Sequence, residues 1–274
     1  MQVAAIQMAS GPNVAANLSE VEKLIGMAAE GGAKLVVLPE NFALMGMSEQ
    51  DKVAIAEQPG KGPIQDFLSR QAAGRRVWLV GGTVPLVSDQ PGHVRAACQL
   101  YNDQGRLVSR YDKIHLFDVD IEQTGENYNE SETIDPGDDM VVSKTPFGNL
   151  GLAVCYDLRF PELFRTLLES DMQILAVPSA FTAITGSAHW DVLVRARAIE
   201  NQCYVIAAAQ GGFHINGRTT YGHSMIVDPW GNVLDTLASG SGVVSAEIDL
   251  SYVQRIRKSF PAVAHRRLSC RTNA

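Results

Sequence analysis

The sequence has 274 residues, of which 46% are hydrophobic and 19% are charged, and its formal net charge at pH 7 is −7. This length is enough for one large domain or two small ones, and the composition is typical of a soluble globular protein. The negative net charge argues against nucleic acid as a partner. No apolar run approaches the roughly 20 residues that span a bilayer, so we expect no association with a membrane.

The cysteines and the first residues of the chain indicate a cytoplasmic protein. The four cysteines lack CxxC spacing and the density of a disulfide framework, which fits a reducing compartment, and the first residues lack the basic region of a secretory signal. The last 24 residues hold no acid. We expect them to form a solvated basic tail, or an arm on a neighbouring acidic subunit, rather than a site for an anionic partner. The cysteines are Cys98, Cys155, Cys203 and Cys270, and the basic residues of the tail are Arg255, Arg257, Lys258, Arg266, Arg267 and Arg271.

Strands and helices alternate in the first half of the sequence. Short apolar runs predict strands buried on both faces, and apolar residues spaced three or four apart predict helices. Residues 45–60 are expected to be a mobile segment, and the acidic residues 114–147 a long loop. We expect, in chain order, a strand at 3–8, a helix at 17–30, a strand at 34–39, a helix at 63–74, a strand at 77–83, and a hairpin pairing 95–102 with 107–111.

The second half repeats this order. The segment LVVLPENF at 35–42 aligns with ILAVPSAF at 174–181, at an offset of 139 residues. We therefore expect a single domain over residues 1–274, with the basic tail from about residue 251, built from a duplicated β-α-β-α-β-β unit. The expected elements are a strand at 149–155, a helix at 161–170, a strand at 173–178, a helix at 188–202, a strand at 204–209, and a hairpin that turns at 228–231.

The repeat predicts an α/β fold of a particular kind. Two similar half-sheets, each flanked by helices, favour a four-layer α-β-β-α sandwich in which the sheets pack face to face. A doubly wound Rossmann fold is disfavoured, because no GxGxxG segment follows the first strand and the hairpins break the strand-helix alternation.

Three residues that could carry chemistry follow predicted strands: Glu40, Lys113 and Cys155. Ligands of α/β sheets gather at the carboxyl ends of strands, so the three side chains could share one cleft. Cys155 also precedes a predicted helix, whose dipole would favour a thiolate. Each residue also has a simpler interpretation: Glu40 as a helix-capping acid, Lys113 as a surface lysine and Cys155 as a buried small hydrophobe. Spacing alone does not decide between a catalytic role and these interpretations.

Longer motifs around these residues resemble the signature segments of the nitrilase, or carbon–nitrogen hydrolase, superfamily. The similarity covers nearly the whole chain and continues through residues 178–210 and 221–231. It implies a cysteine amidase with Glu40 as general base, Cys155 as nucleophile and Lys113 stabilising the oxyanion. The motifs that carry it are LPENF, YDKIHLFD and VCYDLRFPE.

The resemblance also implies the remaining parts of the site. The backbone N–H of Tyr156 would be a second oxyanion donor, and a further glutamate would assist the catalytic set. The segment NESETIDPG places that glutamate at Glu130, with Glu132 as the competitor. No cofactor is implied, and the histidines show no metal-ligand spacing.

For the substrate, the resemblance implies a small carboxylate-bearing amide, which reacts with water. The branch it favours acts on deaminated glutathione, and an omega-amidase acting on 2-oxoglutaramate or 2-oxosuccinamate is the alternative; a non-catalytic scaffold is disfavoured because all three residue types are present. Arg159 could bind a carboxylate, or form a structural ion pair with Glu162 or Asp157. Phe181 and Thr182 are expected to line the pocket. The family implies a homodimer or a larger homo-oligomer.

Overall fold

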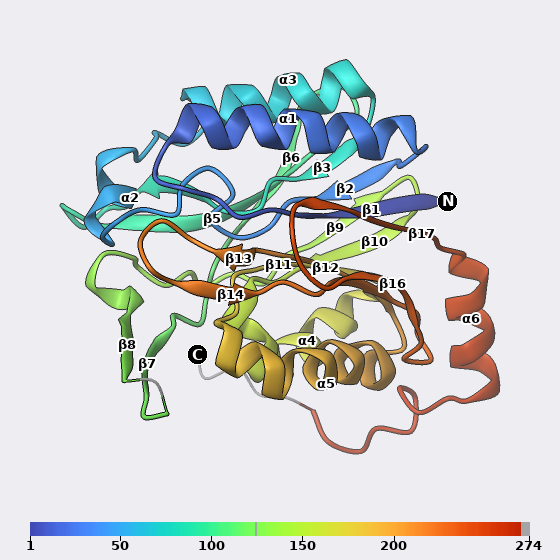
Figure 1. The fold of residues 1–274 in the computed structure, drawn as a ribbon. Helices are drawn as coiled ribbons and strands as arrows, with labels where there is room; N and C mark the ends of the chain where they lie inside the picture. Colours follow the sequence, from blue (N-terminus) through green and yellow to red (C-terminus); the bar gives the residue numbers. More distant parts are fainter. Residues whose placement is uncertain (124, 270–274) are drawn as a thin grey trace.

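The computed structural model describes residues 1–123 and 125–269. Cys270 and the end of the basic tail lie outside the described residues. Figure 1 shows four layers: helices, a sheet, a second sheet, and helices again. The two sheets contact each other through β1 and β2 of one and β11, β12 and β15 of the other. The predicted α-β-β-α sandwich is therefore the observed arrangement.

The first sheet holds the N-terminal half of the chain and one C-terminal strand. The N-terminal residues Gln2–Gln7 of β1 pair in parallel with β2, β2 pairs in parallel with β3, and the last strand, β17, closes the sheet antiparallel to β1. Its strands are β1 (Gln2–Gln7), β2 (Leu35–Val37), β3 (Trp78–Val80), β4 (Val84–Val87), β5 (Val94–Tyr101), β6 (Leu107–Asp112) and β17 (Gly242–Glu247).

The second sheet repeats this plan. Its parallel strands β10, β11 and β12 correspond to β1, β2 and β3, and β12 then pairs with an antiparallel hairpin, as β3 does. This correspondence bears out the predicted duplication of the strand order. The strands are β9 (Val142–Thr145), β10 (Gly148–Leu152), β11 (Ile174–Ser179), β12 (Tyr204–Ala209), β15 (Ser224–Val227) and β16 (Val233–Leu237).

The helices cover the outer faces of the sheets. Helices α1 and α3 lie over the first sheet, and α4 and α5 lie over the second (Figure 1). Buried apolar side chains of α1, such as Val21, Leu24 and Ile25, pack in the same cluster as the outer face of the first sheet. The helices are α1 (Val14–Glu30), α2 (Gln50–Ala54), α3 (Pro63–Arg75), α4 (Pro161–Leu167), α5 (Ala183–Asn201) and α6 (Leu250–Ser259).

The prediction of one long loop at residues 114–147 is wrong in part. This segment contains the two-stranded sheet β7 (Asp118–Ile121) and β8 (Glu126–Asn129), the 3₁₀ helix η1 (Glu130–Glu132) and the edge strand β9. Its apolar residues alternate with acids over only two or three positions, which is too short a pattern to predict a strand from sequence. Residues 45–60 likewise contain the short helix α2.

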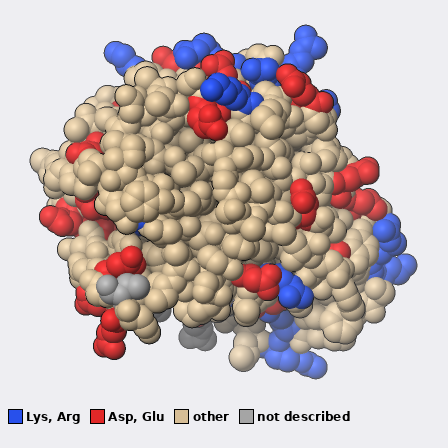
Figure 2. Space-filling model, viewed as in Figure 1, with Lys and Arg blue, Asp and Glu red and all other residues tan. Residues whose placement is uncertain are grey.

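The basic C-terminal segment is partly packed against the chain. Helix α6 carries Arg257, whose guanidinium lies 2.6 Å from Asp171 Oδ1 and donates to the carbonyl oxygen of Met172 at 2.5 Å. Figure 2 shows Lys and Arg side chains gathered on the side of the molecule where α6 lies. No helix in the described part of the chain combines the length and the apolar character of a membrane span.

Candidate active site

The carboxyl ends of strands from both halves open into one cavity of about 510 Å³. Of the residues that the sequence predicted for the site, all line it except Thr182 and Glu132, the competitor of Glu130. Thr182 instead caps α5, where its hydroxyl accepts a hydrogen bond from the Thr185 N–H at 3.3 Å. The residues brought together in the cavity are Glu40, Lys113, Glu130, Cys155, Tyr156, Arg159 and Phe181.

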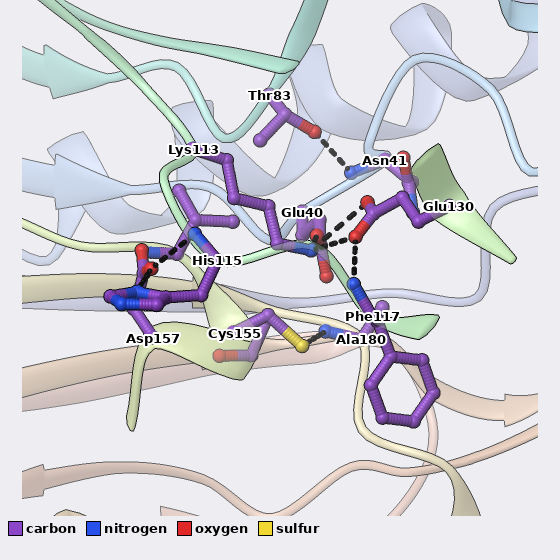
Figure 3. A network of polar contacts seen from close by, with 12 residues as sticks. Glu40, Asn41, Thr83, Lys113, His115, Phe117, Glu130, Cys155, Asp157 and Ala180 are labelled. Atoms are coloured by element: carbon purple, nitrogen blue, oxygen red, sulfur yellow. Dashed lines mark hydrogen bonds and ion pairs between the residues drawn. The ribbon is translucent and has the colours of Figure 1, made fainter. Parts of the chain in front are cut away.

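A buried lysine lies between two carboxylates in this cavity (Figure 3). Lys113 Nζ donates to Glu40 Oε1 at 2.8 Å and to the two oxygens of Glu130 at 3.0 and 2.8 Å. Its side chain is only 1% exposed, so these ion pairs are shielded from solvent. Glu130 also accepts a hydrogen bond from the Phe117 N–H at 2.7 Å, whereas Glu132, the competing candidate, is exposed. The structure therefore places Glu130, and not Glu132, beside Lys113.

Cys155 sits on a tight turn between a strand and a 3₁₀ helix. Strand β10 ends at Leu152, and Cys155 begins η2 (Cys155–Arg159) with a left-handed φ of +49°. That conformation is unfavourable for a side chain other than glycine, so the surrounding contacts must hold it. The sulfur accepts a hydrogen bond from the Ala180 N–H at 3.5 Å. Ala180 directly follows β11, so the end of the strand next to β10 supplies the backbone N–H that meets the thiol.

The electrostatics of the cavity differ from the expectation of a thiolate. Burial raises the pKa of the Cys155 thiol well above its ordinary value, and the Glu40 carboxylate raises it further, against the opposing effect of Lys113. Burial also acts to lower the pKa of Lys113, but Glu130 and Glu40 outweigh it and raise that pKa well above normal. For Glu130, burial is outweighed by Lys113, so its pKa is lowered. The resting site thus pairs a neutral thiol with a charged lysine and Glu130 carboxylate.

A buried aspartate, Asp157, holds the cysteine turn. From the sequence it was predicted only as a possible partner of Arg159. The Asp157 carboxylate is fully buried and accepts hydrogen bonds from the Val154 N–H and the Tyr111 hydroxyl, each at 2.7 Å. The His115 N–H donates to it at 3.2 Å, and His115 Nδ1 lies 2.7 Å from it. Asp157 therefore connects the cysteine turn to the segment that carries Lys113. Tyr111, His115 and Asp157 all lie inside the motifs quoted above, which is the signal that could have identified them.

Replacing Asp157 with alanine is expected to lower the free energy of unfolding by about 3 kcal/mol, because it leaves buried donors without an acceptor. Urea denaturation measures the change. The matched control is Asp191→Ala, whose carboxylate is 54% exposed and lies 3.5 Å from Arg195, and which should change stability by less than about 0.5 kcal/mol. Equal losses in the two variants would contradict the structural role of Asp157.

Arg159 lies between aromatic rings on the cavity wall. Its guanidinium carbon is 5.7 Å from the centre of the Tyr156 ring and 5.3 Å from that of Phe181, and Nη1 lies 3.1 Å from His189 Nδ1. Among the described residues it forms no ion pair, so the alternative of a structural salt bridge with Glu162 or Asp157 is wrong. Arg159 keeps its charge available to the cavity.

Comparisons with known proteins identify the family and agree with this fold. The sequence matches the carbon–nitrogen hydrolase family over residues 2–258. It is 42% identical over 266 residues to the deaminated glutathione amidase of Yersinia enterocolitica, covering 97% of this chain and 92% of that protein. The human deaminated glutathione amidase is 41% identical over 271 residues, with 97% and 82% covered.

Solved structures of the same superfamily share the fold. Nit3 of Saccharomyces cerevisiae, a member of branch 10 of the nitrilase superfamily, superposes with a TM-score of 0.87 at 31% identity, covering 98% of this chain and 97% of that one. The Caenorhabditis elegans NitFhit protein gives the same TM-score at 38% identity; 97% of this chain is covered, but only 65% of NitFhit. The chain therefore belongs to the carbon–nitrogen hydrolase family of the nitrilase superfamily.

Proposed function

We propose that this protein is an amidase that hydrolyses deaminated glutathione through a cysteine thioester. The substrate is suggested by relatives of that name at 41–44% identity. Deaminated glutathione carries a carboxylate beside its 2-oxo group, an internal amide, and a second carboxylate on its glycine. A cavity with buried acid-base groups and the cationic Arg159 suits such a molecule.

The first half of the reaction forms the thioester. Glu40 takes the proton of the Cys155 thiol as the sulfur attacks the amide carbonyl carbon, which moves one negative charge from the carboxylate to the developing oxyanion. The raised pKa of the resting thiol favours a proton transfer that accompanies the attack over one that precedes it. Lys113 and the Tyr156 N–H stabilise the oxyanion; Tyr156 lies in the first turn of η2, where N–H groups lack intrahelical acceptors.

The second half releases the acid. The tetrahedral intermediate collapses, Glu40 gives its proton to the departing amine nitrogen, and the acyl group stays on the Cys155 sulfur. Glu40 then removes a proton from a water that attacks the thioester carbonyl, and the sulfur leaves with that proton as the acid is freed. Glu130 acts through Lys113: by accepting from Nζ with both oxygens, it keeps the ammonium charged and oriented.

The observation that carries this proposal is that the thiol, Glu40, Lys113 and Glu130 meet in one cavity from four separate segments of the chain (Figure 3). A glutamate-to-glutamine mutant of a related amidase from Nesterenkonia sp. AN1, 25% identical with a TM-score of 0.79, carries acrylamide on its active-site cysteine after Michael addition. A reactive cysteine in that protein supports the role of Cys155 here.

Steady-state kinetics on deaminated glutathione, 2-oxoglutaramate and a simple aliphatic amide tests the substrate. We expect kcat/KM to be highest for deaminated glutathione. A higher value for 2-oxoglutaramate would favour the omega-amidase alternative, and similar values for all three would remove the specific substrate. No turnover of any amide would favour a non-catalytic scaffold.

We propose that the protein is a single-domain cytoplasmic homo-oligomer. The family match over residues 2–258 supports one domain, and Cys98, Cys155 and Cys203 are free, as expected in a reducing compartment. Large apolar side chains are exposed on and near α5, including Val192 at 66% and Trp230 at 54%, which supports contact with another copy. Light scattering after gel filtration tests the oligomeric state.

A further inference from the structure

The active-site cavity continues outward into a second, shallower hollow of about 880 Å³. Residues 46–49, 126–128 and 216–218 line the outer hollow. Three residues border both spaces: Glu49, Tyr128 and Arg218. They lie where the two spaces adjoin, and we take this junction as the mouth of the site.

Arg218 is positioned at this mouth by stacking rather than by a close ion pair. It lies between β13 (Gly211–Phe213) and β14 (Thr219–Tyr221), and its guanidinium carbon is 4.7 Å from the centre of the Tyr128 ring. Nη1 is 3.9 Å from Glu49 Oε1, which is too long for a hydrogen bond. Its buried Nε has no hydrogen-bond partner within the described part of the chain. A guanidinium that lies over a ring and keeps its Nε unpaired is suited to a planar carboxylate.

Neither carboxylate that lines the outer hollow holds Arg218 in a hydrogen bond: Glu49 is 3.9 Å from Nη1, and Glu126 keeps one buried oxygen without a partner among the described residues. Glu49 is engaged by Lys52, whose Nζ donates to it at 2.6 Å, so one carboxylate faces two cations. Arg159 has other neighbours: it lies beside Tyr156, Phe181 and His189, whereas Arg218 lies over Tyr128. The cavity thus presents two guanidinium groups, in addition to the ammonium groups of Lys52 and Lys113.

We infer that Arg218 binds a carboxylate on the leaving amine of the substrate, as a second anion site distinct from Arg159. The inference rests on the proposed amidase reaction. In that reaction the acyl group remains on the Cys155 sulfur after the first step, while the amine has to depart toward solvent. The mouth therefore holds the amine side of the substrate, and a cation there selects amines that end in a carboxylate, such as a dipeptide, over ammonia.

The test compares deaminated glutathione with the analogue whose glycine carboxylate is a carboxamide, using wild type and Arg218→Gln. We expect the substitution to lower kcat/KM for deaminated glutathione by about 10- to 100-fold, chiefly through KM, since it removes a charge-assisted hydrogen bond. For the carboxamide analogue the loss should be roughly tenfold smaller. The substitution keeps the hairpin intact, because the main-chain contacts of Arg218, to His214 and Asn216, do not involve its side chain.

Arg70→Gln is the matched control, because Arg70 is exposed on α3 and lines neither the cavity nor the hollow. The kcat/KM of this control variant should equal that of wild type on both substrates. Equal losses on the two substrates in Arg218→Gln, or no loss on either, would overturn the anion site while leaving the amidase proposal intact. Failure of wild type to hydrolyse deaminated glutathione would instead show that the proposed function is wrong.

Discussion

Replacing Cys155 with alanine is expected to reduce kcat for deaminated glutathione by more than about 10⁴-fold, because no other group can hold the acyl intermediate. The side chain is small and nearly buried, so the loss of one sulfur should leave the fold intact. Single-turnover mass spectrometry provides a second readout. Wild type stopped early should carry an added acyl mass, and the variant should carry none.

Cys203→Ala is the matched control for this experiment. Cys203 is also a fully buried free cysteine, but it lies just before β12 with its sulfur 3.9 Å from the Arg197 carbonyl oxygen, and it does not line the cavity. We expect its kcat to stay within about twofold of wild type, with a loss of stability typical of a small cavity. A Cys155→Ala enzyme that keeps more than a few per cent of activity would remove the nucleophile from the mechanism.

The placement of Glu40, Lys113 and Cys155 near strand ends could be predicted from sequence because it depends on local patterns. Glu40 and Cys155 each follow a short apolar strand, and Lys113 follows a hairpin strand. Parallel strands in one sheet end at the same edge, which made a shared cleft possible for Glu40 and Lys113. Cys155 follows a strand of the other sheet, so the family resemblance was needed to expect all three side chains in one cleft. Glu130 was reached only through the family resemblance, since it lies in a 3₁₀ turn within an acidic segment that shows no periodicity.

Other features depend on contacts between distant segments. The sequence indicated a thiolate at Cys155 from a nearby helix dipole, but the position of Glu40 and the depth of burial raise the pKa of the thiol instead. The roles of Asp157 and Thr182 depend on which backbone N–H groups end up beside them. The contact of Arg218 with Tyr128 could not be predicted from sequence, because the two residues are about ninety positions apart and meet only in the folded protein.

Replacing Lys113 with methionine is expected to have the largest combined effect on activity and stability. Methionine fills a similar space, but it leaves the carboxylates of Glu40 and Glu130 buried together without a cation. Loss of the oxyanion donor alone should lower kcat by at least about 10³-fold. Removing one partner of a buried ion pair should lower the free energy of unfolding by about 3–5 kcal/mol at neutral pH.

The pH dependence of stability should also change sign in this variant. In wild type, Lys113 lowers the pKa of Glu130, so the stability from this pair is present above the unfolded carboxyl pKa and is lost as pH falls through the folded value. Without the lysine, two neighbouring buried carboxyls should share a proton, which raises the folded pKa of one of them above the unfolded value of about 4.3. The stability contributed by that carboxyl is then present at low pH and is lost as pH rises through its raised pKa.

Urea denaturation of both proteins across the mildly acidic range measures this reversal: stability should rise or stay level with pH in wild type and fall in Lys113→Met. The matched control is Lys144→Met, an exposed lysine on β9, which should follow the wild-type profile. Parallel profiles for wild type and Lys113→Met would mean that the two carboxylates do not depend on Lys113 for their charge. In that case the proposed coupling between the Lys113 ammonium and the Glu130 carboxylate would be wrong.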